Sequence, residues 1–98
     1  MWQLTSLIGF DWDSGNIDKN WQKHQVKNEE CEQIFFNKPL LVIADKIHSQ
    51  TEIRYYALGK TFSSKFLFIV FTTRKNKIRI ISARLMNKNE HKIYEQKK

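Results

Sequence analysis

Four apolar runs in the second half of the chain most constrain its fold. After Pro39 the sequence changes to segments of alternating or continuous apolar character, each with the length of a β-strand. These segments lie at residues 40–44, 53–58, 66–73 and 78–83. Because β-branched and aromatic residues favour pleated strands, each run predicts a strand. The connections at residues 59–64 and 74–77 are short and polar, which predicts an antiparallel meander for the last three strands.

Two helices are expected before the strands. Asp13 is a suitable N-cap for the first helix. The stripe that this helix would turn inward consists of Ile17, Trp21 and His24. A second helix should begin near Asn28 and must end before Pro39, because the residue before a proline disfavours helical geometry. The side chains that it should bury are Cys31, Ile34 and Phe35.

A third helix is expected near the end of the chain. Asn87 and Glu90 have the spacing of a capping box, with Ile93 and Tyr94 following on the helix. The prediction is therefore an α+β fold with two N-terminal helices, an antiparallel sheet of about four strands and a C-terminal helix. A length of 98 residues suits one core, so residues 1–98 are predicted to form a single domain.

Basic residues are concentrated in the second half of the chain, which carries +7 overall. Residues 1–37 hold three Lys or Arg against six Asp or Glu, a net −3, whereas residues 38–98 hold fourteen against four, a net +10. A basic surface attracts polyanions in a salt-dependent way. Nucleic acid is therefore the leading partner class, although an acidic protein would respond to the same field.

Several classes of protein are disfavoured by the composition. Cys31 is the single cysteine, so the chain cannot form an internal disulfide or a cysteine-rich zinc site. The longest apolar run, residues 66–71, is too short to cross a bilayer, and the N-terminal residues lack the basic start of a signal peptide. We expect a cytoplasmic protein with no cofactor, no bound metal and no membrane contact.

Arginines interrupt and end the last apolar run, Ile78-Arg79-Ile80-Ile81-Ser82-Ala83-Arg84. A guanidinium is always charged and presents a planar fork of donors, so such arginines either pair with carboxylates or bind an anion such as phosphate. Arg79 and Arg84 are five positions apart and would point to opposite faces of an ideal strand. Either a bend re-aims one of them, or Arg84 is structural, with Glu52 or Glu90 as its partner.

A series of short motifs runs in order through the chain. They are Phe10-x-Trp12-Asp13, Asn20-x-x-Lys23-His24-x-Val26, Asp45-x-x-His48, Glu52-x-Arg54, Gly59, Thr73-Arg74, the 78–84 segment, and Glu90 with Tyr94. From about residue 10 to residue 94 this order resembles the BrnT family of toxins. Asn16 and Gln25 stand where that family commonly has lysine and glycine.

The resemblance implies a RelE-like fold and an endoribonuclease toxin of a bacterial type II toxin–antitoxin system. Such a toxin cleaves mRNA and inhibits translation. It implies a BrnA-type antitoxin as the neutralising partner, with RNA as substrate and operator DNA contacted only through the antitoxin.

RNA cleavage without a metal ion needs three functions from the protein. The 2′-hydroxyl must lose a proton, the charge on the phosphorane must be stabilised, and the leaving 5′-oxygen must gain a proton. Arginine suits the second function, and histidine, glutamate or tyrosine the proton transfers. The residues that we predict to be catalytic are Arg74, Arg79, Arg84, His24 and Tyr94, with His48, Glu52 and Glu90 also available. The residues that we predict to bind RNA are Lys19, Lys23, Arg54, Lys75 and Lys77.

Some alternatives stay open at this point. His24 can cap or pack at a helix end instead of reacting, and Glu52 can form a structural ion pair with Arg54 two residues away. The chain can also be a catalytically weak module that binds the antitoxin and co-represses transcription. Loss of Arg74 or Arg79 should abolish cleavage but should be tolerated by antitoxin binding.

Overall fold

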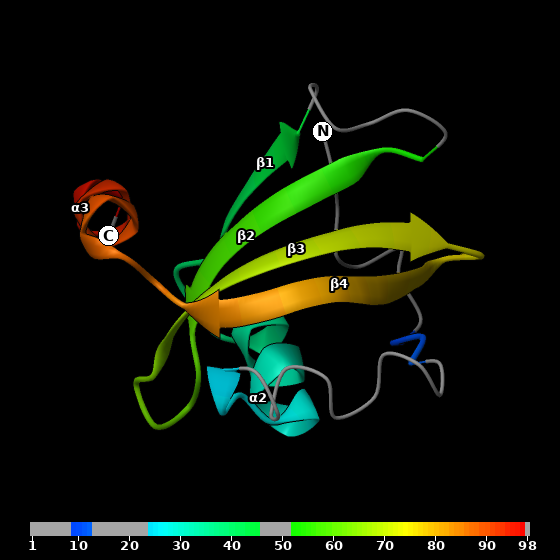
Figure 1. The fold of residues 1–98 in the computed structure, drawn as a ribbon, viewed down its shortest axis with the longest axis horizontal. Helices are drawn as coiled ribbons and strands as arrows, with labels where there is room; N and C mark the ends of the chain where they lie inside the picture. The colour runs from blue at the N-terminus through cyan, green and yellow to red at the C-terminus, as the bar shows by residue number, and fades with distance from the viewer. Residues whose placement is uncertain (1–8, 13–23, 46–51, 98) are drawn as a thin grey trace.

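The computed structural model describes residues 9–12, 24–45 and 52–97, and these form an α+β arrangement (Figure 1). The elements in chain order are α2 (Asn28–Gln33), the 3₁₀ turn η2 (Ile34–Phe36), β1 (Leu41–Asp45), β2 (Arg54–Lys60), β3 (Phe66–Arg74), β4 (Lys77–Leu85) and α3 (Lys88–Gln96). The second predicted helix and the C-terminal helix are confirmed. The first predicted helix falls mainly on residues 13–23, outside the described residues, so one N-terminal helix is observed. The RelE-like assignment stays a prediction.

The four strands form one antiparallel sheet in the order β1-β2-β3-β4. This confirms the predicted strands and the meander, with strand ends that differ from the predicted ends by at most two residues. The pairing of β3 with β4 contains one irregularity, between Val70 and Phe71. Val70 pairs with Ser82 and Phe71 with Ile80, so Ile81 has no counterpart and forms a β-bulge.

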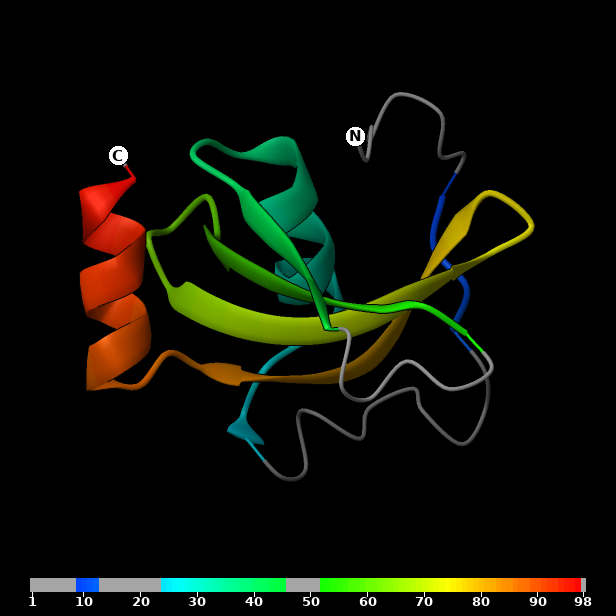
Figure 2. The same cartoon turned by 90° about the horizontal axis from the view of Figure 1, so that it is seen from above.

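One face of the sheet, here called the inner face, packs against α2 and η2 (Figure 2). The buried residues of this core are Val26, Cys31, Ile34, Phe35, Ala57, Leu67, Ile69, Phe71, Ile78, Ile80 and Ala83. Fully burying a large apolar side chain contributes about 1.5–3 kcal/mol, so this layer is the main source of stability. Cys31, Ile34 and Phe35 are buried as the sequence predicts.

The other face, here called the outer face, is partly covered at one end by α3. The predicted capping box is present: the Glu90 backbone N–H donates to Asn87 Oδ1 over 2.9 Å, and the Asn87 N–H donates to Glu90 Oε1 over 2.8 Å. Tyr94 of α3 is fully buried and belongs to a small second core with Leu58 and Met86. This second core fixes α3 against the end of the sheet at which β4 finishes (Figures 1 and 2).

Residues 9–12 run beside β4 as a short parallel neighbour. The Asp11 N–H donates to the Ile78 carbonyl over 2.8 Å, and the Ile78 N–H donates to the Gly9 carbonyl over 2.8 Å. On the inner side, the Phe10 ring meets the Phe35 ring edge to face, with 5.7 Å between centroids. These two hydrogen bonds fix residues 9–12 against β4 and bring Asp11 to the edge of the sheet.

Candidate active site

The bulge at Ile81 places Arg79 and Arg84 on the same face of the sheet. Arg79 pairs with Thr72 and Arg84 pairs with Phe68, and these two β3 residues are four positions apart, so both lie on the outer face. Without the extra residue, side chains five positions apart would point to opposite faces. One unpaired residue thus supplies the bend that was one of the two alternatives left open by the sequence.

Arg74 ends β3 and holds a carboxylate with both sides of its guanidinium. Its Nε lies 2.8 Å from Glu52 Oε2, and its Nη2 lies 2.7 Å from Glu52 Oε1. The pair is open to solvent, because 48% of the Arg74 side chain is exposed. A bidentate pair of this kind orients the guanidinium plane. The sequence pointed to Arg54 as the partner of Glu52, whereas the bidentate partner is Arg74.

Arg79 lies near this pair and is more enclosed. Its Nη1 lies 3.3 Å from Asp11 Oδ2, and 23% of its side chain is exposed. The hydrogen bonds from Arg74 hold the pKa of Glu52 below its ordinary value, and the positive charges of Arg79 and Arg54 lower it further. Three arginines and two carboxylates therefore share one electrostatic environment at this end of the sheet.

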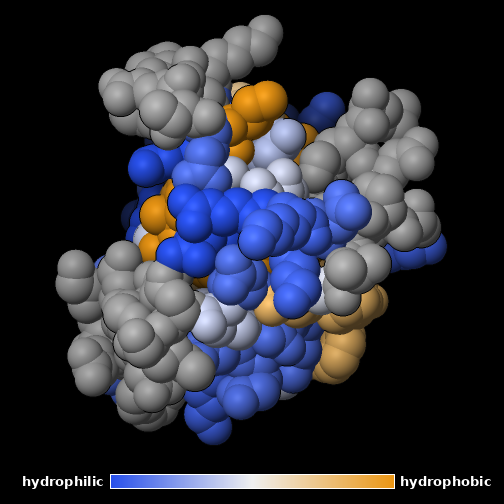
Figure 3. Space-filling model, turned by 90° about the vertical axis from the view of Figure 1, so that its right-hand side faces the viewer, coloured by the Kyte–Doolittle hydropathy of each residue, from blue (hydrophilic) through white to orange (hydrophobic). Residues whose placement is uncertain are grey.

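A hollow of about 360 Å³ opens at the same place, where β3 turns into β4. The described residues that line it are Asp11, Arg74, Lys75 and Lys77. The turn itself is tight, since Lys75 and Asn76 both have positive φ angles, 51° and 64°, as in a two-residue type I′ hairpin. Seen from this end, the described surface is mainly hydrophilic (Figure 3). We call Asp11, Glu52, Arg74, Lys75, Lys77 and Arg79 the turn-end cluster.

Arg84 belongs to a different group of residues. Its Nη1 and Nη2 lie 2.8 and 2.9 Å from the two Glu90 oxygens, and its guanidinium stacks 4.3 Å from the Phe68 ring centroid. At about 3.3 Å per strand residue, Arg84 is roughly 15 Å from Arg79 along β4. Burial raises the pKa of Glu90, but hydrogen bonds from Arg84 and the Asn87 backbone outweigh it and keep that pKa below its ordinary value. This geometry matches the structural alternative for Arg84, in which it ties α3 to the sheet.

Comparison with known protein families identifies the family of this chain. The family model of the ribonuclease toxin BrnT, of type II toxin–antitoxin systems, matches residues 12–90. The chain belongs to the BrnT family. The search of curated proteins gave no match. Family membership makes the protein a ribonuclease toxin by class and implies an antitoxin as its partner.

The BrnT match includes most of the turn-end cluster but not every predicted site residue. Glu52, Arg74 and Arg79 lie inside residues 12–90, whereas Asp11 immediately precedes this range and Tyr94 follows it. Asp11 was absent from the sequence prediction. Its contact with Arg79 joins positions 68 residues apart, and no local pattern signals such a contact.

Besides Arg84, two more of the predicted catalytic residues of this BrnT chain, Tyr94 and His24, are not members of the turn-end cluster. The Tyr94 hydroxyl donates to the Pro39 carbonyl over 2.6 Å, and burial, together with the charge of Glu95, raises the Tyr94 pKa. In this position Tyr94 packs and anchors α3. His24 is exposed at the start of residues 24–45. The predicted RNA-binding Lys19 and Lys23, and the candidate His48, lie outside the described residues.

Two further findings concern metals and membranes. Within residues 9–12, 24–45 and 52–97, no group of three or more His, Cys, Asp or Glu side chains is placed to hold a metal ion. None of the helices in these ranges is long and apolar enough to span a membrane.

Proposed function

We propose that this BrnT-family toxin is a metal-independent endoribonuclease that cleaves mRNA in the cytoplasm and so inhibits translation. The observation that carries the proposal is the turn-end cluster: Arg74 and Arg79 stand beside two carboxylates and a hollow lined by Lys75 and Lys77. This combination offers donors for a phosphate and oxygens that can accept a proton. The family supplies the ribonuclease class.

Binding of the scissile phosphate is assigned to the arginines. Arg79 is held from one side by Asp11, and Arg74 is oriented by Glu52, so both guanidinium groups are positioned before substrate arrives. Preorganised donors stabilise the extra negative charge of a phosphorane without reorganisation during the reaction. Lys75 and Lys77 add positive charge for the neighbouring phosphates of the chain.

Removal of the 2′-hydroxyl proton is assigned to Glu52. Because its pKa is lowered by Arg74, the carboxylate is ionised at neutral pH and can accept a proton. A phosphate that competes for Arg74 weakens the hydrogen bond to Glu52, and this raises the basicity of Glu52 as substrate binds. The freed 2′-oxygen attacks phosphorus and the 5′-oxygen leaves with a proton, which yields a 2′,3′-cyclic phosphate. His24 lies outside the turn-end cluster, so the proton for the leaving 5′-oxygen is assigned to solvent, and the role of His24 in proton transfer stays a prediction from the sequence.

Neutralisation is assigned to a BrnA-type antitoxin, which alone would contact operator DNA. Its existence is implied by the family. The basic outer face is the surface that it would cover, since opposite charge steers association and suppresses wrong partners.

The test is cleavage of a defined RNA in the presence of EDTA by protein freed of antitoxin. Wild type, Arg79→Ala, Glu52→Gln and the control Lys92→Ala should be compared; Lys92 is an exposed basic residue on α3, outside the turn-end cluster. We expect cleavage by wild type and Lys92→Ala, and a loss of at least 100-fold in Arg79→Ala and Glu52→Gln. Equal cleavage by all four proteins contradicts the assignment. Absence of cleavage by wild type favours the catalytically weak antitoxin-binding module.

A further inference from the structure

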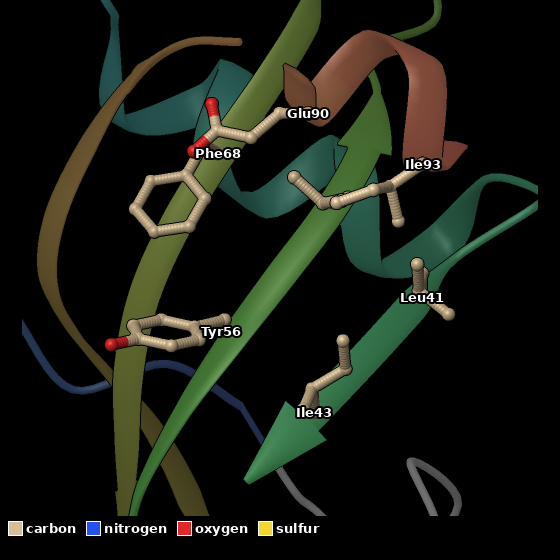
Figure 4. A pocket seen from close by; sticks show the side chains of 7 residues that line it. Leu41, Ile43, Tyr56, Phe68, Glu90 and Ile93 are labelled. Carbon is tan, nitrogen blue, oxygen red and sulfur yellow. The ribbon is translucent and has the colours of Figure 1, made fainter. Parts of the chain in front are cut away.

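The outer face carries a second concave feature, at the end opposite the turn-end cluster. A hollow of about 340 Å³ lies between the sheet and α3. The residues that line it in Figure 4 include Leu41 and Ile43 from β1, Tyr56 from β2, Phe68 from β3, and Glu90 and Ile93 from α3. We call this feature the α3 groove. Its lining is mainly apolar, with the Glu90 carboxylate and the Tyr56 hydroxyl as its polar groups, unlike the turn-end cluster.

Two isoleucines on opposite walls of the α3 groove are left half exposed. Ile43 on β1 is 49% exposed and Ile93 on α3 is 44% exposed. The side chains of Leu41, Ile43 and Ile93 lie around the same opening (Figure 4). Large apolar side chains that gather around one concave opening mark a binding surface more often than scattered ones do.

The chemistry of this lining fits an aliphatic or aromatic protein side chain better than a nucleobase. Leu41, Ile43 and Ile93 offer no hydrogen-bonding groups. The polar groups of the lining are already engaged, since Glu90 is bonded to Arg84 and Tyr56 to Asp45. The polar edge of a base would therefore be left unsatisfied there. The Phe68 ring, which could otherwise stack on a base, is already covered by Arg84 at 4.3 Å.

The charges around the α3 groove define the partner further. The basic strand residues of the outer face are Arg54, Lys60, Arg74, Lys77, Arg79 and Arg84, and its acidic strand residue is Asp45. Three more carboxylates, Glu52, Asp11 and Glu90, pair with Arg74, Arg79 and Arg84. Six basic side chains therefore meet four carboxylates, which leaves a positive excess. Lys88 and Lys92 are exposed on α3, the helix that forms one wall of the groove. Such a surface attracts a segment that combines apolar side chains with acidic ones.

We propose that the α3 groove receives an apolar anchor side chain from an acidic segment of the antitoxin. The family provides a partner whose task is to bind this chain, and the groove provides the apolar anchor point that a charged surface lacks. The inference depends on family membership and not on the ribonuclease mechanism proposed above.

An anchor in this position would also let one short antitoxin segment reach the turn-end cluster. Phe68 at the α3 groove and Arg74 at the cluster lie on the same face of β3, six residues apart. At about 3.3 Å per residue this separation is roughly 20 Å, which an extended segment of about six residues spans. A segment anchored at Ile93 would therefore lie across Arg79 and place its acidic side chains over the cluster.

The test measures binding of the antitoxin encoded in the same operon to purified toxin variants by calorimetry. Ile43→Glu and Ile93→Glu place a negative charge on each wall of the groove, and Phe62→Glu, at a 65% exposed position in the turn between β2 and β3, is the matched control. We expect each groove variant to raise Kd at least tenfold, the double variant to raise it further, and Phe62→Glu and the conservative Ile93→Leu to bind as wild type. RNA cleavage by the antitoxin-free groove variants should match that of wild type.

Unchanged antitoxin affinity in both groove variants overturns the proposal. So does loss of RNA binding with antitoxin affinity retained, which would make the groove a nucleotide subsite. If a glutamate variant does not fold, p-benzoylphenylalanine at position 93 replaces it. On irradiation this side chain should crosslink to the antitoxin, whereas the same residue at position 62 should not, and a crosslink from position 62 alone contradicts the assignment.

Discussion

Tyr94→Phe separates a structural role of the C-terminal helix from a catalytic one. The substitution removes only the hydroxyl that donates to the Pro39 carbonyl over 2.6 Å, while the ring remains in the second core. Tyr94 is fully buried, but Pro39 is only partly buried, so water can reach the carbonyl after the change. The cost should therefore be about 1 kcal/mol, near the value of an ordinary hydrogen bond.

Chemical denaturation with urea, followed by circular dichroism, measures this cost. In a thermal melt of a domain of this size, about 1 kcal/mol corresponds to a Tm lower by about 4–8 °C. In urea, the slope of the unfolding free energy against urea concentration should be unchanged. The RNA cleavage rate under conditions where both proteins are folded should equal that of wild type. Unchanged stability together with a large loss of cleavage would refute the structural assignment and restore Tyr94 as a catalytic residue.

Three further predictions follow from individual contacts. The pKa of Glu90 is lowered in the folded state, so its pair with Arg84 stabilises the fold at pH values above the ordinary pKa of 4.5, and this stabilisation is lost as the pH falls below that value. On acidification through this range, wild type should lose more unfolding free energy than Glu90→Gln. Equal losses would contradict the shift. Deletion of Ile81 should turn the strand residues that follow it, Arg84 among them, toward the opposite face or force the strands out of register, and either should abolish cooperative thermal unfolding; a native-like melting curve would show that the bulge is dispensable. Burial raises the pKa of Cys31 to about 12, so a thiol reagent at pH 8 should modify it only after denaturation, and rapid modification of folded protein would disprove its burial.

The secondary structure was largely predictable because its causes are local. The apolar runs gave all four strands of the described sheet, and Asn87 with Glu90 gave the start of α3. The ends of the strands were less accurate, since polar residues such as Lys77 continue the pairing beyond the apolar run. Charge distribution likewise indicated a basic surface in the second half of the chain.

The candidate site was predictable only in part. Arg74 and Arg79 were selected as anion-binding residues from their types and positions, and the structure brings them together. Asp11 and the α3 groove were not found, because each depends on segments that meet only after folding. Arg84 was included with the catalytic set although its carboxylate partner is on α3.

The sequence by itself determined the elements, the concentration of positive charge and the family to which the chain belongs, since these are properties of neighbouring residues and their order. Only the tertiary structure decided which carboxylate each arginine meets. Glu52 contacts Arg74 across 22 positions and Asp11 contacts Arg79 across 68, and the single unpaired residue Ile81 sets which face Arg84 occupies. Pairing partners depend on strand register and on the path of the chain. A shift of one residue in the register moves every side chain that follows to the other face of the sheet.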